Sequence, residues 1–128
     1  MTEYRIGEVA DVMGVSADTV RRLVDSGQVL TARTSRGERL VDGADLARYL
    51  AEQGVGVPNS QESARNHFPG IVTRVVKDGV MAQVEIQAGR HRIVSLISRE
   101  AADELMLEPG VRAIAAIKST NVVVELPR

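Results

Sequence analysis

Residues 14–27, GVSADTVRRLVDSG, contain the signals that begin and end a short helix. Ser16 belongs to the residue types that cap helix N-termini, and Asp18 follows in the first turn, where the helix dipole favours a carboxylate. Three aliphatic residues recur at helical spacing and should be buried: Val20, Leu23 and Val24. Gly27 then ends the run. The stretch therefore predicts a capped helix that starts just after Ser16.

A second helix is predicted immediately before this one, in RIGEVADVMG (residues 5–14). Four apolar residues of this segment fall at helical spacing: Ile6, Val9, Ala10 and Met13. Gly14 is a natural C-terminal stop, so only a few residues around Val15 separate the two helices. Two helices joined by so short a glycine-containing turn predict a helix-turn-helix.

A hairpin and a third helix follow the helix-turn-helix. Residues 29–41, VLTARTSRGERLV, contain two short β-like runs around a glycine-containing tip, which predicts a wing. Asp42 can cap a helix in GADLARYLAEQ (residues 43–53), whose apolar face carries Leu46, Tyr49 and Leu50. Residues 1–53 thus predict a winged helix-turn-helix domain.

Arginine is concentrated on the second helix and the wing. From Ser16 to Arg39 there are five arginines and three carboxylates, whereas the rest of this half is acidic. Arginine suits DNA because its planar group donates paired hydrogen bonds to guanine edges and phosphates. The order of cap, turn, helix and wing agrees with that role, so we predict a DNA-binding surface. The alternative is a solvated helix face beside an ordinary charged hairpin.

The second half of the chain follows a different pattern. GVGVPNSQ, residues 54–61, has no periodicity and predicts a linker. Beyond it, residues 62–128 alternate β-branched runs with turn sequences, and one short helix, REAADELM, should begin after Ser98. Five strands are predicted: residues 70–76, 80–87, 92–98, 111–118 and 122–126. This content predicts a small, partly open barrel of OB type, and the whole chain is then α+β in two domains.

Composition excludes several function classes. The chain has 128 residues and no cysteine, which excludes disulfides, thiolate zinc sites and a cysteine nucleophile. The start lacks the features of a signal peptide, and no stretch approaches the ~20 apolar residues of a membrane span, so a soluble, cytoplasmic protein is expected. The two histidines, His67 and His91, have no nucleophile or carboxylate arrangement beside them, so we expect no enzyme.

Two polar segments of the second half carry hydrogen-bond donors. In ESARNHFP (residues 62–69), which is too polar for a core strand, the donors are Ser63, Arg65, Asn66 and His67. In IKSTNV (residues 117–122), Lys118 follows an apolar run, and a buried ammonium there is costly unless an anion is close.

Ser98 supplies a third donor group, where a predicted strand ends and the short helix exposes its first N–H groups. Three donor groups at strand ends predict a small-anion site. No carboxylate accompanies them, which disfavours a metal cation. The alternative is that these side chains satisfy loop carbonyls while Lys118 reaches water.

Two motifs of the first half, VS..TVRR in the second helix and RT..G.R in the wing, extend the prediction. Through them residues 4–50 resemble the MerR and excisionase-like winged-helix family. The resemblance implies major-groove contacts from the helix that Ser16 opens, through Thr19, Arg21 and Arg22. It implies phosphate or minor-groove contacts from the wing, through Arg33, Arg36 and Arg39. The long dimerisation helix and effector domain of MerR regulators are absent from this sequence.

Four motifs of the second half occur in order: SARN, the IS before the short helix, L.L..G and IKST.V. Through them residues 62–126 resemble the Mop domain of the molbindin or TOBE group, an OB-like barrel that binds molybdate or tungstate between subunits. The resemblance implies six oxyanion-binding residues: Ser63, Arg65, Asn66, Ser98, Lys118 and Ser119. His67 and Phe68 depart in part from the family's usual run.

Together, the residues and the resemblances predict a molybdate- or tungstate-responsive transcription regulator that binds double-stranded DNA. The Mop resemblance implies a homo-oligomer, with a hexamer expected and a dimer as the alternative. Two other readings stay open. The protein could store or buffer molybdate, with the helix-turn-helix contacting other proteins, or it could be an architectural, excisionase-like DNA binder with a degenerate TOBE domain.

Overall fold

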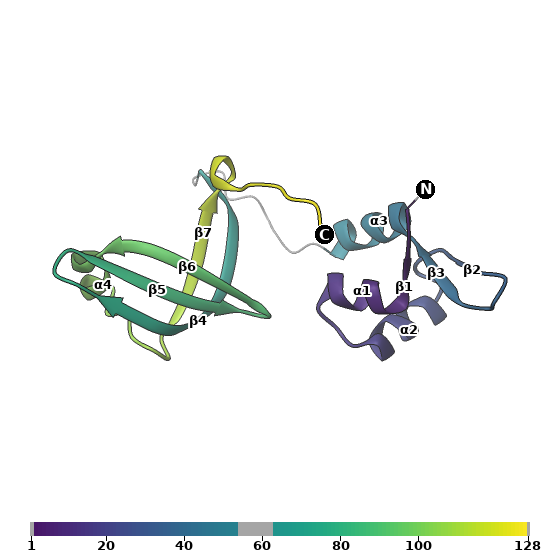
Figure 1. The fold of residues 1–128 in the computed structure, drawn as a ribbon, viewed down its shortest axis with the longest axis horizontal. Helices are drawn as coiled ribbons and strands as arrows, with labels where there is room; N and C mark the ends of the chain where they lie inside the picture. Colours follow the sequence, from purple (N-terminus) through teal and green to yellow (C-terminus); the bar gives the residue numbers. More distant parts are fainter. Residues whose placement is uncertain (1, 54–62, 128) are drawn as a thin grey trace. The chain divides into compact units, whose positions relative to one another are not determined.

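The computed structural model describes residues 2–53 and 63–127, and the chain forms two compact units, Met1–Val57 and Pro58–Arg128 (Figure 1). The predicted linker, residues 54–61, and Glu62 at the start of the predicted second domain lie outside the described residues. The α+β class in two domains is confirmed, with helices dominating the first unit and strands the second.

The N-terminal unit contains the predicted helix-turn-helix. The elements in order are β1 (Glu3–Arg5), α1 (Ile6–Met13), α2 (Ala17–Asp25), β2 (Thr31–Arg33), β3 (Arg39–Asp42) and α3 (Gly43–Gln53). Gly14 ends α1 in the left-handed conformation at φ 69°, which glycine adopts without a Cβ clash. Ser16 caps α2, because its Oγ accepts a hydrogen bond from the Thr19 N–H at 3.1 Å. Both signals were read correctly from the sequence.

The wing is the antiparallel pair β2–β3, and the three strands are ordered β1-β3-β2. Sequence reasoning missed β1, because three residues are too short to show an alternation. Asp42 caps α3 as predicted, since its Oδ2 accepts from the Asp45 N–H at 2.9 Å. The core under these elements is made of aliphatic side chains: Val9, Ala10, Val20, Val24, Val29, Val41 and Leu46.

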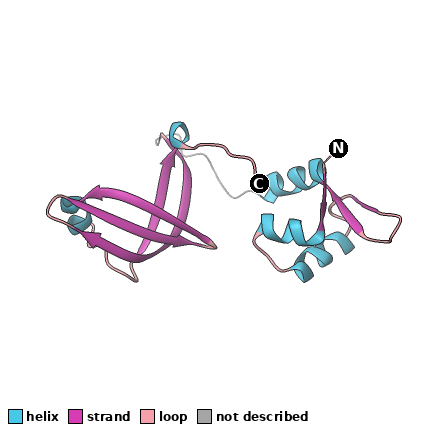
Figure 2. Ribbon diagram, viewed as in Figure 1, coloured by secondary structure: helices cyan, strands magenta, loops and turns pink. Residues whose placement is uncertain are grey.

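The C-terminal unit is a four-stranded antiparallel sheet in the order β6-β5-β4-β7. Its elements are β4 (Ala64–Lys77), β5 (Met81–Ala88), β6 (His91–Ser98), α4 (Arg99–Glu104), β7 (Arg112–Lys118) and the 3₁₀ turn η1 (Ser119–Asn121). The long strand β4 pairs with β7 through its first half and with β5 through its second half, so the sheet curves as in an OB-type barrel (Figure 2). Val72 and Val84 lie fully buried at its centre.

Two strand predictions in this unit are wrong. The polar run after Glu62 is not outside the sheet, because β4 already begins at Ala64. Its side chains alternate, with Ala64 and Asn66 half-buried and Arg65 and His67 exposed, so the charged group stays in water while the backbone pairs with β7. Residues 122–126 have strand propensity but form no strand, since no described strand pairs with them.

Glu85 on β5 is the buried charged residue of the C-terminal unit, with 5% of its surface exposed. Arg92 on β6 donates to its Oε1, and Arg74 on β4 lies with Nη1 3.4 Å from Oε2. The hydrogen bond from Arg92 holds the pKa of the Glu85 carboxyl below its usual range, and the charges of both arginines act in the same direction. The carboxylate therefore ties three neighbouring strands together.

Glu85→Gln should lower the free energy of unfolding of the C-terminal unit at neutral pH. It should also reduce the decrease in that free energy between neutral and acidic pH. A carboxyl with a depressed pKa stabilises the fold fully above its unfolded-state pKa of about 4.3, and this contribution disappears as the pH falls through the lower folded-state value. Urea unfolding by circular dichroism at pH 7 and at pH 3.5 measures the difference. The exposed residue Glu108 gives the matched control, Glu108→Gln, and an equal pH dependence in Glu85→Gln and the unmodified protein would contradict the assignment.

Candidate functional site

The pairing of β4 with β7 brings two of the three predicted donor groups to one end of the sheet. Ala64 lies opposite Lys118, and Asn66 lies opposite Ile117. Ser63 immediately precedes β4, and Ser119 opens η1 directly after β7. The residues of this end, called here the SARN–IKS cluster, are Ser63, Arg65, Asn66, Lys118 and Ser119. Segments more than fifty residues apart in sequence thus meet, because antiparallel strands join their opposite ends.

The members of the SARN–IKS cluster differ in their contacts. Asn66 is half-buried, and its Nδ2 donates to the carbonyl oxygen of Ile117 at 3.0 Å. This hydrogen bond fixes the start of β4 against the end of β7 at a shift in their register. The other four side chains are exposed. One amide thus locks the backbone of the cluster, while one guanidinium, one ammonium and two hydroxyl groups face solvent around it.

Lys118 is exposed, so the prediction of a buried ammonium at this position is wrong. β7 is an edge strand whose residues alternate between exposed and covered faces, and Lys118 falls on the exposed face at its end. Within one chain no anion is therefore needed to offset burial of this charge. An oxyanion here would instead meet a cation that is already solvated and available.

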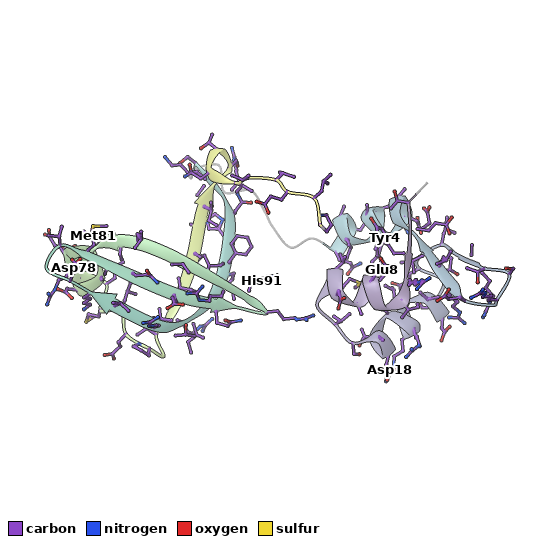
Figure 3. All side chains as sticks on the ribbon, viewed as in Figure 1. Tyr4, Glu8, Asp18, Asp78, Met81 and His91 are labelled. Carbon is purple, nitrogen blue, oxygen red and sulfur yellow. The ribbon has the colours of Figure 1, made fainter. Side chains whose placement is uncertain are left out.

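Ser98 does not join the SARN–IKS cluster within one chain. It ends β6 opposite Met81 of β5, next to the end of β4 that is remote from the cluster. Figure 3 labels Met81 at this end of the sheet and His91 at the other end of the β5–β6 hairpin. Ser98 caps α4, because its Oγ accepts from the Ala101 N–H at 3.0 Å, as the sequence predicted. A site that includes Ser98 needs a second copy of the chain.

In the N-terminal unit, the predicted DNA-binding residues of α2 are exposed, on the side away from Val20 and Val24. The hydroxyl groups of Ser16 and Thr19 lie 2.9 Å apart and belong to the helix cap. Arg21 donates to Asp18 Oδ1 at 2.7 Å across one helical turn. These contacts leave Arg22 as the arginine of α2 for which the described residues show no ion pair.

On the wing, the predicted DNA-binding arginines fall into two kinds. Arg33 Nη1 donates to the Gly37 carbonyl oxygen at 2.9 Å and so braces the tip, while Arg36 is exposed on the tip itself. Arg39 pairs with Asp25 at 2.5 Å and thereby ties the wing to the end of α2. Arg39 is thus a positioning residue for the wing in this structure.

Arg48 on α3 was not identified from the sequence. It connects α3 to the segment between α2 and β2, which contains Gln28. Its guanidinium group donates to Asp45, to Glu52 and to the carbonyl oxygen of Gln28. Hydrogen bonds from Arg48 and from the Leu30 N–H lower the pKa of the Asp45 carboxyl. An acidic residue three positions before an arginine on a helix was the available signal.

Within the described ranges 2–53 and 63–127, no helix is long and apolar enough to cross a membrane. The same described residues contain no cluster of three or more His, Cys, Asp or Glu side chains that could hold a metal ion.

Two family models match the chain, and the boundary between them falls at the predicted linker, residues 54–61. Residues 3–54 match the model of a helix-turn-helix domain, and residues 62–124 match the model of the TOBE domain.

Three similar proteins bear on the chain. Molybdenum-pterin-binding protein MopB of Rhodobacter capsulatus is 31% identical over 140 residues, which cover 98% of this chain and 52% of MopB. Molybdenum-pterin-binding protein 1 of Clostridium pasteurianum is 38% identical over 63 residues, which cover 48% of this chain and 93% of that protein. The structure of the cytoplasmic molybdate-binding protein ModG, with molybdate bound, has a TM-score of 0.50 at 37% identity and covers 52% of this chain and 48% of ModG. The chain spans about half the length of MopB and less than half that of the related MopA.

Proposed function

Because the chain belongs to the TOBE-domain family through residues 62–124, we propose that it is a molybdate- or tungstate-responsive, DNA-binding transcription regulator of the cytoplasm. The observation that carries the proposal is the SARN–IKS cluster. Strand pairing places a guanidinium, an ammonium and two hydroxyl groups at one end of a barrel whose relatives include a molybdate-binding protein. No catalytic role is assigned, since the proposed activity is binding alone.

The cluster has the chemistry that a tetrahedral dianion requires. Arg65 and Lys118 supply positive charge, and charge-assisted hydrogen bonds to an oxyanion are about twice as strong as neutral ones. Ser63 and Ser119 supply donors that adapt to the remaining oxygen atoms. Ser98 would complete the site from a second copy, so that the oxyanion lies between C-terminal domains. Asn66 takes part by holding β4 and β7 in register.

The N-terminal unit, residues 1–53, is proposed as the DNA reader, with the MerR and excisionase-like docking that its motifs imply. Arg22 on α2 and Arg36 at the wing tip are exposed and are the first candidates for base and phosphate contacts. Arg33 and Arg39 hold the wing in shape through Gly37 and Asp25, and from the wing they are proposed to lie near the DNA phosphates. A single small winged helix reads few bases, so the reader should act in pairs within a homo-oligomer, with a hexamer expected and a dimer as the alternative.

Oxyanion binding and DNA binding are coupled only if the oxyanion has different affinities for two arrangements of the readers. An oxyanion shared between copies meets this condition, since it fixes how those copies are placed. The linkage is reciprocal, so DNA should change oxyanion affinity by the same factor.

Titration calorimetry with molybdate, tungstate and sulfate tests the binding half of this proposal. We expect a dissociation constant below about 1 μM for molybdate or tungstate and much weaker sulfate binding, because sulfate is smaller and the site must select by size. Heat from none of the three would show that the barrel does not bind oxyanions.

Arg22→Ala should weaken DNA binding by about tenfold or more and leave oxyanion affinity unchanged, because a bidentate arginine contact contributes about 1–3 kcal/mol. Fluorescence anisotropy with a labelled duplex, selected with the protein from random sequences, measures the change. Arg90, exposed in the β5–β6 turn, gives the matched control Arg90→Ala. Equal DNA affinity in the two variants would refute the assignment of α2 as the reading helix.

Storage or buffering of molybdate is the second candidate function, and one observation favours it. Two of the five predicted DNA-binding arginines, Arg21 and Arg39, are paired with the neighbouring carboxylates Asp18 and Asp25, which reduces the positive potential of the reading face. A storage protein would bind the oxyanion and yield no preferred sequence in a selection from random duplexes.

A further inference from the structure

The exposed face of α2 carries charges of both signs. Four residues at helical spacing form this face, called here the α2 stripe: Asp18, Arg21, Arg22 and Asp25. They are exposed, whereas Val20 and Val24 are buried on the other side of the helix. Two guanidinium groups thus lie between two carboxylates, and the formal charges of the stripe cancel. Non-specific DNA binding depends on positive charge, so the two carboxylates oppose it and need a different explanation.

The two carboxylates of the α2 stripe make different contacts. Asp25 lies at the end of α2 and pairs with Arg39 of the wing, so it joins two elements of the unit. Asp18 lies in the first turn and pairs within the helix, because Arg21 Nη1 donates to its Oδ1 at 2.7 Å. The side chain of Asp18 is 79% exposed, and Figure 3 labels it on the outer side of α2. Asp18 is therefore the carboxylate of the stripe that is open to DNA.

Helix stability does not account for Asp18. The N-terminus of α2 already has a cap, because Ser16 Oγ accepts a hydrogen bond from the Thr19 N–H. The helix dipole favours a carboxylate in the first turn, but this effect is small at an exposed position and is screened by salt. An exposed ion pair three residues apart on a helix likewise contributes little, since water screens both charges. The carboxylate of Asp18 is therefore available for a role in binding.

We propose that Asp18 is a specificity-determining residue of the DNA reader and that it selects a G·C base pair together with Arg21. In a helix-turn-helix, the first residues of the second helix contact base edges in the major groove. Guanine presents the acceptors O6 and N7 there, and cytosine presents the N4 amino group as a donor. The guanidinium of Arg21 matches guanine, and the carboxylate of Asp18, which only accepts hydrogen bonds, matches cytosine. The inference rests on the proposed DNA-binding function and adds a residue that selects sequence.

The ion pair also prepares Arg21 for this contact. The hydrogen bond to Asp18 engages one Nη1 donor of the guanidinium, so its remaining N–H groups are left for a base edge. A guanidinium that is already held on the helix loses less freedom when it binds guanine. The carboxylate acts against other sequences, because DNA without a cytosine amino group at this place leaves the negative charge of Asp18 uncompensated. Asp18 thus favours one sequence and disfavours the rest.

Selection of duplexes from random sequences by the full-length protein tests the proposal. Asp18→Asn removes the negative charge and keeps the size of the side chain. Glu52→Gln is the matched control, because Glu52 is an exposed carboxylate that pairs with Arg48 on α3, outside the predicted DNA-binding elements. The unmodified protein and Glu52→Gln should select the same sequence, with a strongly preferred G·C pair. Asp18→Asn should reduce the preference at that pair by about fivefold or more and retain the preferences at other positions.

Fluorescence anisotropy with a scrambled duplex of the same base composition supplies a second readout. At low salt, Asp18→Asn should bind this duplex about threefold or more tightly than the unmodified protein, because one charge that repels phosphates is gone. The difference should shrink as salt screens that charge. Glu52→Gln should stay within about twofold of the unmodified protein. A purely structural role of Asp18 would instead weaken binding to the selected and the scrambled duplex alike.

The outcomes distinguish this inference from the proposed function. An unchanged base preference in Asp18→Asn would overturn the role of Asp18 and leave the DNA reader in place. Equal weakening of binding to the selected and scrambled duplexes would overturn it too, since the residue would then act only on the fold of α2. No preferred sequence for the unmodified protein would overturn both the role of Asp18 and the proposed DNA-binding function.

Discussion

Replacing Lys118 with alanine should weaken molybdate binding by about a hundredfold, the largest functional effect expected of a single substitution in this chain. Lys118 carries one of the two positive charges of the SARN–IKS cluster. A dianion that loses a charge-assisted donor retains its desolvation cost without the compensating contact. Titration calorimetry of the variant with molybdate measures the loss directly, and Arg65→Ala should act in the same direction.

The other lysine of the chain provides a matched control. Lys77 ends β4 far from the cluster along the strand, and its Nζ is already paired with Asp103 at 2.5 Å. Lys77→Ala should leave the molybdate dissociation constant within about twofold of the original, as expected for a distant, independent site. If Lys118→Ala and Arg65→Ala both retain full affinity, the oxyanion does not bind at the SARN–IKS cluster.

Gly70→Ala should destabilise the C-terminal unit by about 2–3 kcal/mol, the largest stability effect expected from the addition of a single methyl group. A Cβ at this position would lie 2.3 Å from the carbonyl oxygen of Gln87 and 3.0 Å from the Cα of Ala88. Both neighbours are backbone atoms of β5, so neither can rotate away. The close approach lies beside the point where β4 passes from its pairing with β7 to its pairing with β5.

Urea unfolding distinguishes the two units in this experiment. The two tyrosines, Tyr4 and Tyr49, both lie in the N-terminal unit, so tyrosine fluorescence follows that unit while circular dichroism follows both. Gly70→Ala should shift the dichroism transition and leave the fluorescence transition in place. Gly79→Ala is the control, because a Cβ there meets nothing within 4 Å. Equal midpoints of the dichroism transition in Gly70→Ala and Gly79→Ala would show that β4 and β5 accommodate the added methyl group without loss of stability.

The features that sequence reasoning predicted correctly are local ones. Gly14, Ser16, Asp42 and Ser98 act over three or four residues, and the structure shows each as the cap or stop that was expected. Helical periodicity likewise identified the buried aliphatic residues of the three helices in the first unit, but not Val29 and Val41, which lie outside them. Propensity and capping decide such features within one turn of the chain.

The features that were misjudged depend on distant pairing. The first residues of β4 are polar and become a strand only because β7, more than forty residues later, lies beside them. Lys118 was expected at a buried strand end, but its strand is an edge, which no local pattern reveals. Residues 122–126 have the composition of a strand without a partner in their own chain. Strand propensity predicts an extended backbone, but it does not indicate which edge of a sheet the segment pairs with.

The candidate site was predictable in part for the same reason. The motifs SARN and IKST.V identified donors that the fold brings together, since they lie at the paired ends of β4 and β7. The sequence could not show that Ser98 lies at the end of the sheet remote from the cluster, because that position depends on the pairing of β6 with β5. On the DNA-binding side, the sequence indicated five arginines, whereas only the structure shows that two of them, Arg21 and Arg39, are paired with Asp18 and Asp25.

A single titration measures whether oxyanion binding changes DNA binding. The affinity of the full-length protein for a duplex selected from random sequences is measured by fluorescence anisotropy without oxyanion, with saturating molybdate, and with sulfate at the same ionic strength. We expect molybdate to change the dissociation constant for DNA by about fivefold or more and sulfate to leave it unchanged, as for an allosteric coupling of about 1–3 kcal/mol. The same DNA affinity in all three conditions would contradict it.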